Sequence, residues 1–243
     1  MTIKRITPCP ILEATIQINC TFNVEQDVLV GVIYSLLGGN IPPNNNNISV
    51  EPLPILNLPD EIRRNDPNLR DKPWFKINYN GFFILIGIYG VSLGLNPPYN
   101  GWESFKDFSV MVFHKLQENV IKEISAITLR YLDFFKEINI FEHINCSLIL
   151  NEKPINGIPT VIRTELPYGN FVNALQITNG VHVKNLALGL DKDGSLIEMS
   201  LFTKKVSIDN FENIIEEAHT LQKDSFFKLL TKDFLNTFSV DYE

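Results

Sequence analysis

Hydrophobic and polar positions alternate along residues 13–22 (EATIQINCTF), a pattern typical of a strand with one buried face. The apolar side consists of Ala14, Ile16, Ile18 and Cys20. The polar side consists of Glu13, Thr15, Gln17 and Asn19. The chain therefore has a half-buried strand close to its N-terminal end.

The pattern then changes to a helical period. Residues 23–39 predict a helix with Asn23 as its N-cap and with Gly38 and Gly39 at its C-terminal end. Its apolar positions at helical spacing are Val28, Val32 and Leu36. Residues 48–56 (ISVEPLPIL) then predict an edge strand, because prolines are tolerated in a sheet mainly at its edges.

Two further strands and a second helix complete this part of the chain. Residues 73–79 and 82–95 predict strands joined by the hairpin signal Asn80-Gly81. A helix begins near Asn100, which has the spacing of a capping box with Glu103. Its apolar stripe consists of Phe105, Phe108, Val112, Leu116 and Val120.

The second half of the chain repeats this order. Residues 127–135 (ITLRYLDFF) predict a strand, and residues 136–145 a short helix. A meander of antiparallel strands with glycine-containing turns follows over residues 146–203. The last helix, over residues 209–230, begins with Asp209 and Glu212 at capping-box spacing.

Both halves thus follow the order β-α-β4-α, which indicates an internal duplication. Residues 1–122 form the first half and residues 123–243 the second, either as two units or as one continuous domain. Two such units joined edge to edge give an α+β fold with a broad antiparallel sheet and long helices on one face. This order is similar to helix-grip and TATA-binding-protein architectures, a likeness that does not imply function.

One charged residue interrupts the apolar strand 127–135. Alternation places Arg130 on the face opposite to Tyr131. In the duplication Arg130 takes the place of Gln17, so pairing of the first strands of both halves would bring Arg130 to Glu13 as an ion pair at their seam. The alternative is that Arg130 lines a groove and binds an anionic group or a partner.

Composition and charge narrow the class of protein. Apolar residues make up 44% of the chain, enough for a substantial core. The formal net charge of −7 disfavours nucleic-acid binding as the main function, because that function usually requires a basic patch. Three cysteines, no apolar leader and an apolar run at residues 82–95 that is interrupted by glycines predict a cytoplasmic protein without a membrane partner.

Patterns that carry catalytic chemistry are weak in this sequence. His143 and Cys146 are the only close His/Cys pair, whereas zinc takes four ligands, so we expect no metal and no other cofactor. Neither a nucleophile elbow nor a phosphate-binding glycine loop is present. Acid/base chemistry by a pair of carboxylates stays an alternative. The carboxylates on predicted strands are Glu13, Asp133, Glu165 and Glu198.

Four segments, PILEATIQI, GVSLGLNPPYNGWESF, ITLRYLDFF and IIEEAHTLQKDSFFKLLTKDFL, together resemble an uncharacterised, sporadically distributed family of bacterial proteins of about the same length. The resemblance covers nearly the whole chain. Its anchors are Pro10, Glu13, Trp102, Arg130, Tyr131, His219 and Phe227. The family tends to carry Asn where this chain has Asp133. Its patchy distribution implies horizontally moving genes, such as defence or accessory modules.

We therefore expect a non-enzymatic binding or interaction protein, in the phage-defence or toxin-associated setting that the resemblance implies. Its candidate binding or seam residues are Glu13, Trp102, Arg130, Tyr131 and His219. A protein partner or a second copy is expected, with a small ligand as the alternative. A second hypothesis is an enzyme acting on a nucleotide or nucleic acid, with Arg130, His219 and Glu13 converging in a groove under the long helices. A third is a structural subunit of a homo-oligomer.

Overall fold

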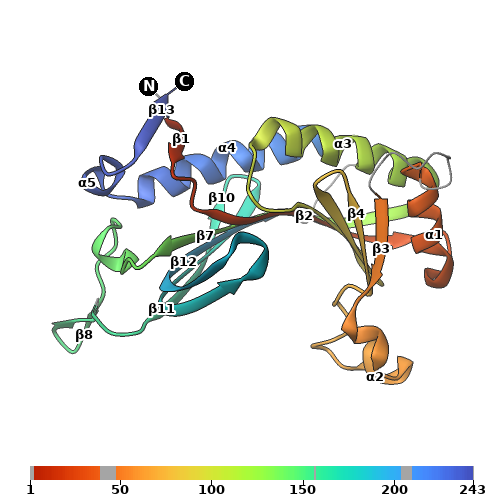
Figure 1. Ribbon diagram of the computed structural model, residues 1–243, viewed down its shortest axis with the longest axis horizontal. Helices are drawn as coiled ribbons and strands as arrows, with labels where there is room; N and C mark the ends of the chain where they lie inside the picture. Colours follow the sequence, from red (N-terminus) through yellow and green to blue (C-terminus); the bar gives the residue numbers. More distant parts are fainter. Residues whose placement is uncertain (1–2, 39–47, 156, 204–209, 243) are drawn as a thin grey trace.

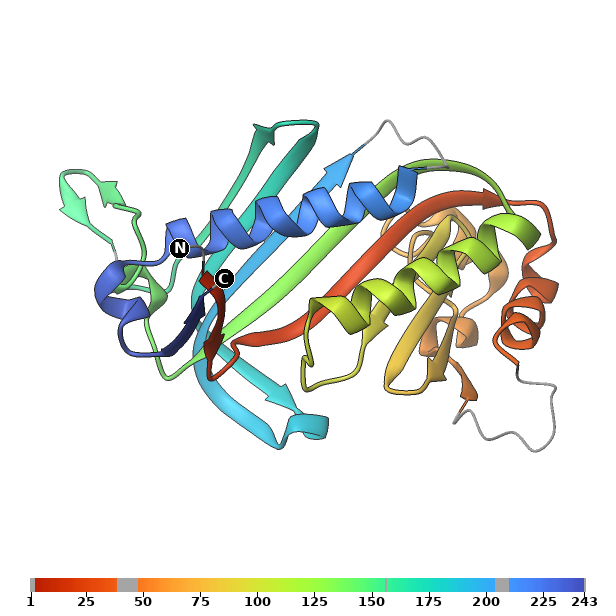
Figure 2. The ribbon, with the colours of Figure 1, turned by 90° about the horizontal axis from the view of Figure 1, so that it is seen from above.

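The computed structural model describes residues 3–38, 48–155, 157–203 and 210–242. Within these residues the protein is α+β, and its centre is a nine-stranded antiparallel sheet with the order β10-β11-β12-β7-β2-β6-β5-β4-β3. Helices α3 and α4 lie side by side on one face of this sheet (Figures 1 and 2). The predicted class and the broad antiparallel sheet are confirmed.

The elements follow each other in a regular order. Residues 3–119 form β1 (Ile3–Thr7), β2 (Ile11–Phe22), α1 (Gln26–Leu36), β3 (Ile48–Pro52), η1 (Pro54–Asn57), α2 (Asp60–Asn65), β4 (Phe75–Tyr79), β5 (Phe82–Gly87), β6 (Gly90–Leu95) and α3 (Trp102–Asn119). Residues 121–242 form β7 (Ile121–Lys136), η2 (Ile140–Glu142), β8 (Ile149–Leu150), β9 (Lys153–Pro154), β10 (Val161–Tyr168), β11 (Phe171–Asn185), η3 (Leu186–Leu188), β12 (Leu190–Thr203), α4 (Phe211–Leu229), α5 (Lys232–Leu235) and β13 (Ser239–Tyr242).

The two long strands β2 and β7 pair at the centre of the sheet, and we call this pairing the seam. Ala14 lies opposite Tyr131 and Ile16 opposite Leu129. All four are buried on the helix side, and the alternation in residues 13–22 predicted this for Ala14 and Ile16. The predicted boundary between residues 122 and 123 falls inside β7, so strands from both ranges belong to one continuous sheet.

The core lies between the sheet and the two helices. The predicted apolar stripe of α3 is buried throughout, and it consists of Phe105, Phe108, Val112, Leu116 and Val120. Phe113 of α3 stacks on Phe211 of α4, with ring centroids 3.9 Å apart. Because both rings are buried, this stack fixes the spacing of the two helices above the sheet.

The buried face of α1 differs from the predicted one by a single position. Leu29, Ile33 and Leu37 face the core, whereas Val28 is 55% exposed. The segment is apolar almost throughout, so its periodicity alone does not decide which stripe is buried. The predicted N-cap is also wrong: Glu25, without a side-chain hydrogen bond, occupies that position instead of Asn23.

The predicted strand 82–95 is two strands. The chain turns at Ile88 and Tyr89 between β5 and β6. Gly90 at the start of β6 permits a close approach to β2, because a Cβ there would lie 2.1 Å from the carbonyl oxygen of Ile18. A residue with a side chain would push β6 away from β2.

The predicted helix at residues 136–145 is a single 3-10 turn, η2. Ile140 and Phe141 are adjacent and both buried, and the Ile140 N–H donates to Ser195 Oγ at 3.1 Å. This contact ties the segment to β12 instead of letting a helix continue. After η2, β8 and β9 form a separate two-stranded sheet, so residues 121–242 contribute four strands to the large sheet and residues 3–119 contribute five.

The capping box predicted for Asn100 and Glu103 is not seen, and the one predicted for Asp209 and Glu212 lies partly outside the described residues. Gly101 precedes α3 without a side-chain cap, and Asn100 Oδ1 accepts a hydrogen bond from Ser104 Oγ at 3.1 Å. Asp209 lies outside the described residues, and α4 begins after Asn210 with no side-chain cap. Both helices are therefore held by packing more than by their ends.

The two ends of the described chain pair with each other. β1 and β13 form a two-stranded antiparallel sheet in which Ile6 lies opposite Val240 and Thr7 opposite Ser239. Arg5 Nε forms an exposed ion pair with Asp241 Oδ2 at 2.5 Å. None of the described helices is both long enough and apolar enough to cross a membrane.

Replacing Phe113 by Ala should lower the free energy of unfolding by about 3–5 kcal/mol, because it empties a fully buried ring site and removes the stack on Phe211. Urea unfolding followed by circular dichroism measures this change. Tyr89→Ala, which removes a half-exposed ring from a turn, is the control and should change stability by less than about 0.5 kcal/mol. Equal losses in both variants would contradict the assigned core.

Candidate functional site

Strand β7 presents different chemistry on its two faces. Arg130 and Tyr131 are neighbours in sequence and point to opposite sides of the sheet, as strand geometry requires. Arg130 lies on the face away from α3 and α4, which we call the helix-free face. Tyr131 lies under the helices, where it contacts His219 of α4.

On the helix-free face, Arg130 joins three strands. Its Nη1 donates to Glu13 Oε1 of β2 at 2.7 Å, and its Nε donates to Glu198 Oε1 of β12 at 2.8 Å. Burial lowers the pKa of the Arg130 guanidinium, but hydrogen bonds and charge from Glu198 and Glu13 outweigh this and raise it. The predicted Glu13–Arg130 ion pair at the seam is confirmed, and Glu198 extends it to a neighbouring strand.

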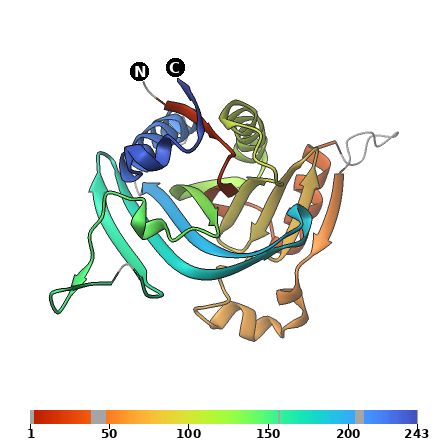
Figure 3. The same ribbon diagram turned by 60° about the vertical axis from the view of Figure 1, so that its left-hand side comes forward.

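The helix-free face continues as a polar surface toward the edge of the sheet. Arg163 and Glu165 of β10 form an exposed ion pair at 2.8 Å. Between this pair and Arg130 lies a small hollow of about 140 Å³. It is lined by Arg163, Ala174, Leu175, Gln176, Glu198, Ser200 and Phe202. Figures 1 and 3 show that α3 and α4 cover the opposite face, so these side chains lie on a part of the sheet that the two helices leave open.

On the helix side, three of the predicted residues form one cluster. Trp102 of α3 stacks on His219 of α4 with ring centroids 4.1 Å apart and an interplanar angle of 9°. The Tyr131 hydroxyl lies 3.1 Å from His219 Nδ1, and Trp102 Nε1 donates to Glu216 Oε2 at 3.0 Å. Burial raises the pKa of Tyr131 well above its usual value. The cluster thus joins both helices to β7.

The five predicted site residues therefore divide into two groups on opposite faces of the sheet. Glu13 and Arg130 lie on the helix-free face, and Trp102, Tyr131 and His219 lie on the helix side. The enzyme hypothesis requires Arg130, Glu13 and His219 to converge. That convergence is not found, because the sheet itself separates His219 from the other two.

Asp133 is buried on the helix side, with 3% of its surface exposed. The sequence pattern identifies it only as a carboxylate on a predicted strand. Desolvation raises its pKa to about 8, so the carboxyl is mostly protonated at neutral pH. Burial also raises the pKa of the nearby Tyr99 to about 12 and that of the Cys9 thiol. A protonated carboxyl has the shape of a carboxamide and can donate a hydrogen bond.

Sequence reasoning missed Gln222, which fastens α4 to the sheet. Its side chain is 2% exposed, and Nε2 donates to the carbonyl oxygens of Leu129 at 3.1 Å and Met199 at 2.8 Å. These acceptors lie on the adjacent strands β7 and β12. The only signal in the sequence is its position, which continues the buried face of Ile215 and Ala218.

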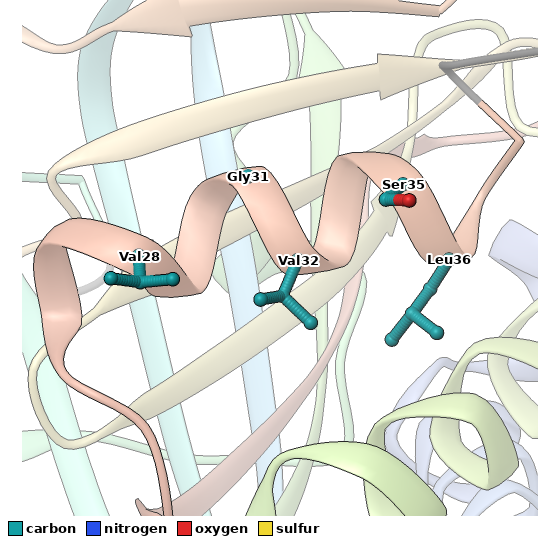
Figure 4. Close-up of a pocket in the computed structure, with 5 residues that line it drawn as sticks. All are labelled: Val28, Gly31, Val32, Ser35 and Leu36. Carbon is teal, nitrogen blue, oxygen red and sulfur yellow. The ribbon is translucent and has the colours of Figure 1, made fainter.

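A second hollow, of about 510 Å³, lies along the outer side of α1 (Figure 4). It is lined by Val28, Gly31, Val32, Ser35 and Leu36. All five residues belong to one helix and carry no charge, so the hollow offers apolar contact without a group that could orient a ligand.

The described residues contain no group of three His, Cys, Asp or Glu side chains arranged to hold a metal ion. His143 of the predicted His143/Cys146 pair stacks on Phe234 with ring centroids 4.4 Å apart. Cys9, Cys20 and Cys146 are free thiols. His143 therefore packs against an aromatic ring of α5.

Neither a family model nor a curated protein matches this chain. The resemblance to the sporadically distributed bacterial family therefore stays a prediction.

Arg130→Met should lower the free energy of unfolding by about 1–2 kcal/mol, because it leaves Glu13 and Glu198 partly buried without their shared cation. The loss of unfolding free energy should become smaller in the double variant Arg130→Met/Glu198→Gln, because it also removes one of the two carboxylates that have lost their cation. Arg5→Met, which breaks the exposed pair with Asp241, is the control and should cost less than about 0.5 kcal/mol. Losses of equal size for Arg130 and Arg5 would contradict the role of Arg130 at the seam.

Asp133→Asn should flatten the pH dependence of stability. The folded pKa of Asp133 is raised from 3.8 to about 8, so the unfolded chain loses this proton first as the pH rises. The wild type should therefore lose about 1.4 kcal/mol of unfolding free energy per pH unit from this group between the two pKa values. Denaturant unfolding across this pH range should show the variant gaining stability relative to wild type toward pH 8. Parallel pH profiles would overturn the assignment of Asp133 as a buried neutral acid.

Proposed function

We propose that this chain is a binding protein without catalytic activity of its own, and that it recognises a protein partner through the helix-free face of its sheet. The observation that carries this proposal is the row of paired charges held on rigid strands of that face. Glu13, Arg130 and Glu198 belong to three neighbouring strands and have side chains that are 42%, 28% and 33% exposed. They are fixed in place and still accessible to a partner.

The chemistry of this face suits recognition better than proton transfer. The Arg130 guanidinium stays charged in proteins, and it forms ion pairs with the carboxylates of Glu13 and Glu198. Charges of both signs alternate across the face, with Arg163 and Glu165 continuing the pattern. Complementary charge patterns select a protein partner and exclude others, whereas a nucleic acid would favour a basic surface.

The proposed architecture is two similar β-α-β4-α halves related across the seam, as in helix-grip and TATA-binding-protein folds. The strand order supports it, because β6 and β12 flank β2 and β7 in corresponding positions, and α3 and α4 each follow the strand that flanks the seam. The 3-10 turn η2 in place of a helix, and the separate β8–β9 sheet, distinguish the second half. In this proposal the sheet of both halves forms one recognition surface.

The resemblance to the sporadically distributed bacterial family supplies the proposed setting. In that setting the chain is an accessory component of a phage-defence or toxin-associated system, and its partner is another protein of the same system. This part of the proposal depends on the resemblance alone.

A native pull-down of the tagged protein, followed by mass spectrometry, tests the proposal. The wild type should capture a stoichiometric protein partner. Gln17→Arg places a new charge on the exposed centre of the helix-free face and should reduce capture by about tenfold or more. Thr220→Arg, which adds the same charge to the exposed side of α4, is the matched control and should not reduce it.

The outcomes separate the hypotheses. Capture that Thr220→Arg abolishes and Gln17→Arg preserves would place the interface on the helices and contradict the proposed face. A nucleotide or nucleic acid that co-purifies without any protein would contradict the binding-protein proposal and favour the enzyme hypothesis.

A further inference from the structure

We propose that two copies of this chain associate through strand β10, which pairs antiparallel with β10 of the second copy and joins the two sheets. β10 is the last strand of the large sheet, and among the described strands it pairs with β11 alone. An edge strand offers unpaired N–H and C=O groups that form hydrogen bonds with another strand. This inference does not depend on the proposed function, because it concerns an edge of the sheet and a second copy of the chain.

The edge carries apolar surface that an isolated edge strand would normally avoid. Val161 is 63% exposed and Leu166 is 60% exposed, and both belong to β10. Natural edge strands are usually short, charged or covered, because exposed apolar edges lead to unspecific association. In antiparallel pairing centred on Thr164, Leu166 lies beside Ile162 of the second copy and Val161 beside Pro167, so both side chains lose exposed apolar surface.

The sequence of β10 is complementary to itself about Thr164. Antiparallel pairing centred there places Arg163 opposite Glu165 of the second copy, and Glu165 opposite Arg163 of the second copy. The same register brings Ile162 opposite Leu166 of the second copy. Like side chains therefore meet on one face and opposite charges on the other, which is the self-complementarity that a two-fold interface requires.

The two charged residues already lie on one face with their side chains outward. Arg163 Nη2 and Glu165 Oε1 are 2.8 Å apart, and the side chains are 63% and 52% exposed. Pairing of two copies would convert two such ion pairs into a cluster of four alternating charges across the two-fold axis. A register shifted by two residues along the second copy would bring like charges together, so the charges select one register.

The backbone of β10 agrees with this register. Pro167 has no N–H to donate, and within a sheet a proline fits where its nitrogen points away from the neighbouring strand. Backbone groups alternate along a strand, so Arg163 and Glu165 direct their N–H and C=O groups to the same open side as Pro167. These are the residues that pair across the axis, and Pro167 limits the pairing at the end of the strand.

Multi-angle light scattering over a wide range of protein concentration tests the inference. The wild type should approach twice the chain mass of 27.7 kDa as the concentration rises. Arg163→Glu alone and Glu165→Arg alone should each remain at the monomer mass, because each places like charges opposite each other. The double variant Arg163→Glu/Glu165→Arg restores opposite charges in every pair and should recover the dimer mass.

A mixture of the two single variants is a further check. One copy with Arg163→Glu and one copy with Glu165→Arg have opposite charges at both positions of the interface, so the mixture should form a dimer that neither variant forms alone. A wild type that stays a monomer at all concentrations would overturn the inference. So would a dimer that survives either single charge reversal, or a double variant that remains monomeric. Far-ultraviolet circular dichroism of each variant confirms that the fold is intact.

Discussion

The pairing of β2 with β7 is the constraint on which the rest of this structure depends. Its paired residues are between 99 positions (Phe22 and Ile121) and 122 positions (Ile11 and Asp133) apart in the chain. Every other strand of the large sheet is added to one side of this pairing or the other. Such a pairing must overcome a large loss of chain entropy before it forms. The contacts that accompany it are correspondingly strong: buried aliphatic residues on the helix side, and the Arg130 ion pairs on the other.

The same pairing explains why two adjacent residues have unrelated roles. Tyr131 belongs to the aromatic cluster that attaches α3 and α4, whereas Arg130 ties three strands together on the opposite face. A strand with period two can serve both purposes only while its register is fixed. The helix-side cluster and the charges on the helix-free face therefore support each other through β7, although no side chain passes from one to the other.

Much of this arrangement could be predicted from the sequence, and the failures have physical reasons. Alternation in β2 identified its buried face, and alternation around Arg130 placed Arg130 and Tyr131 on opposite faces of β7. The Glu13–Arg130 pair followed from placing both strands at the seam. Its third member, Glu198, depends on β12 being the next neighbour of β7, and strand order is not a local property of sequence. The burial of Asp133 was missed because a carboxylate on a strand usually lies on the face exposed to solvent, and which face of β7 the helices cover is not a local property of the sequence.

The pairing of β1 with β13 determines where a label, a tether or a fused domain can be attached to this protein. Both ends leave the fold at one place, on the side of the sheet that carries α3 and α4 (Figures 1 and 3). Ile3 and Tyr242 lie opposite each other in this ribbon, so a short linker could join the two strands, and a new opening in an exposed loop would keep the order of the strands in the sheet. A label, a surface tether or a fused domain at either end would occupy the same spot, and it would leave the opposite face of the sheet unobstructed.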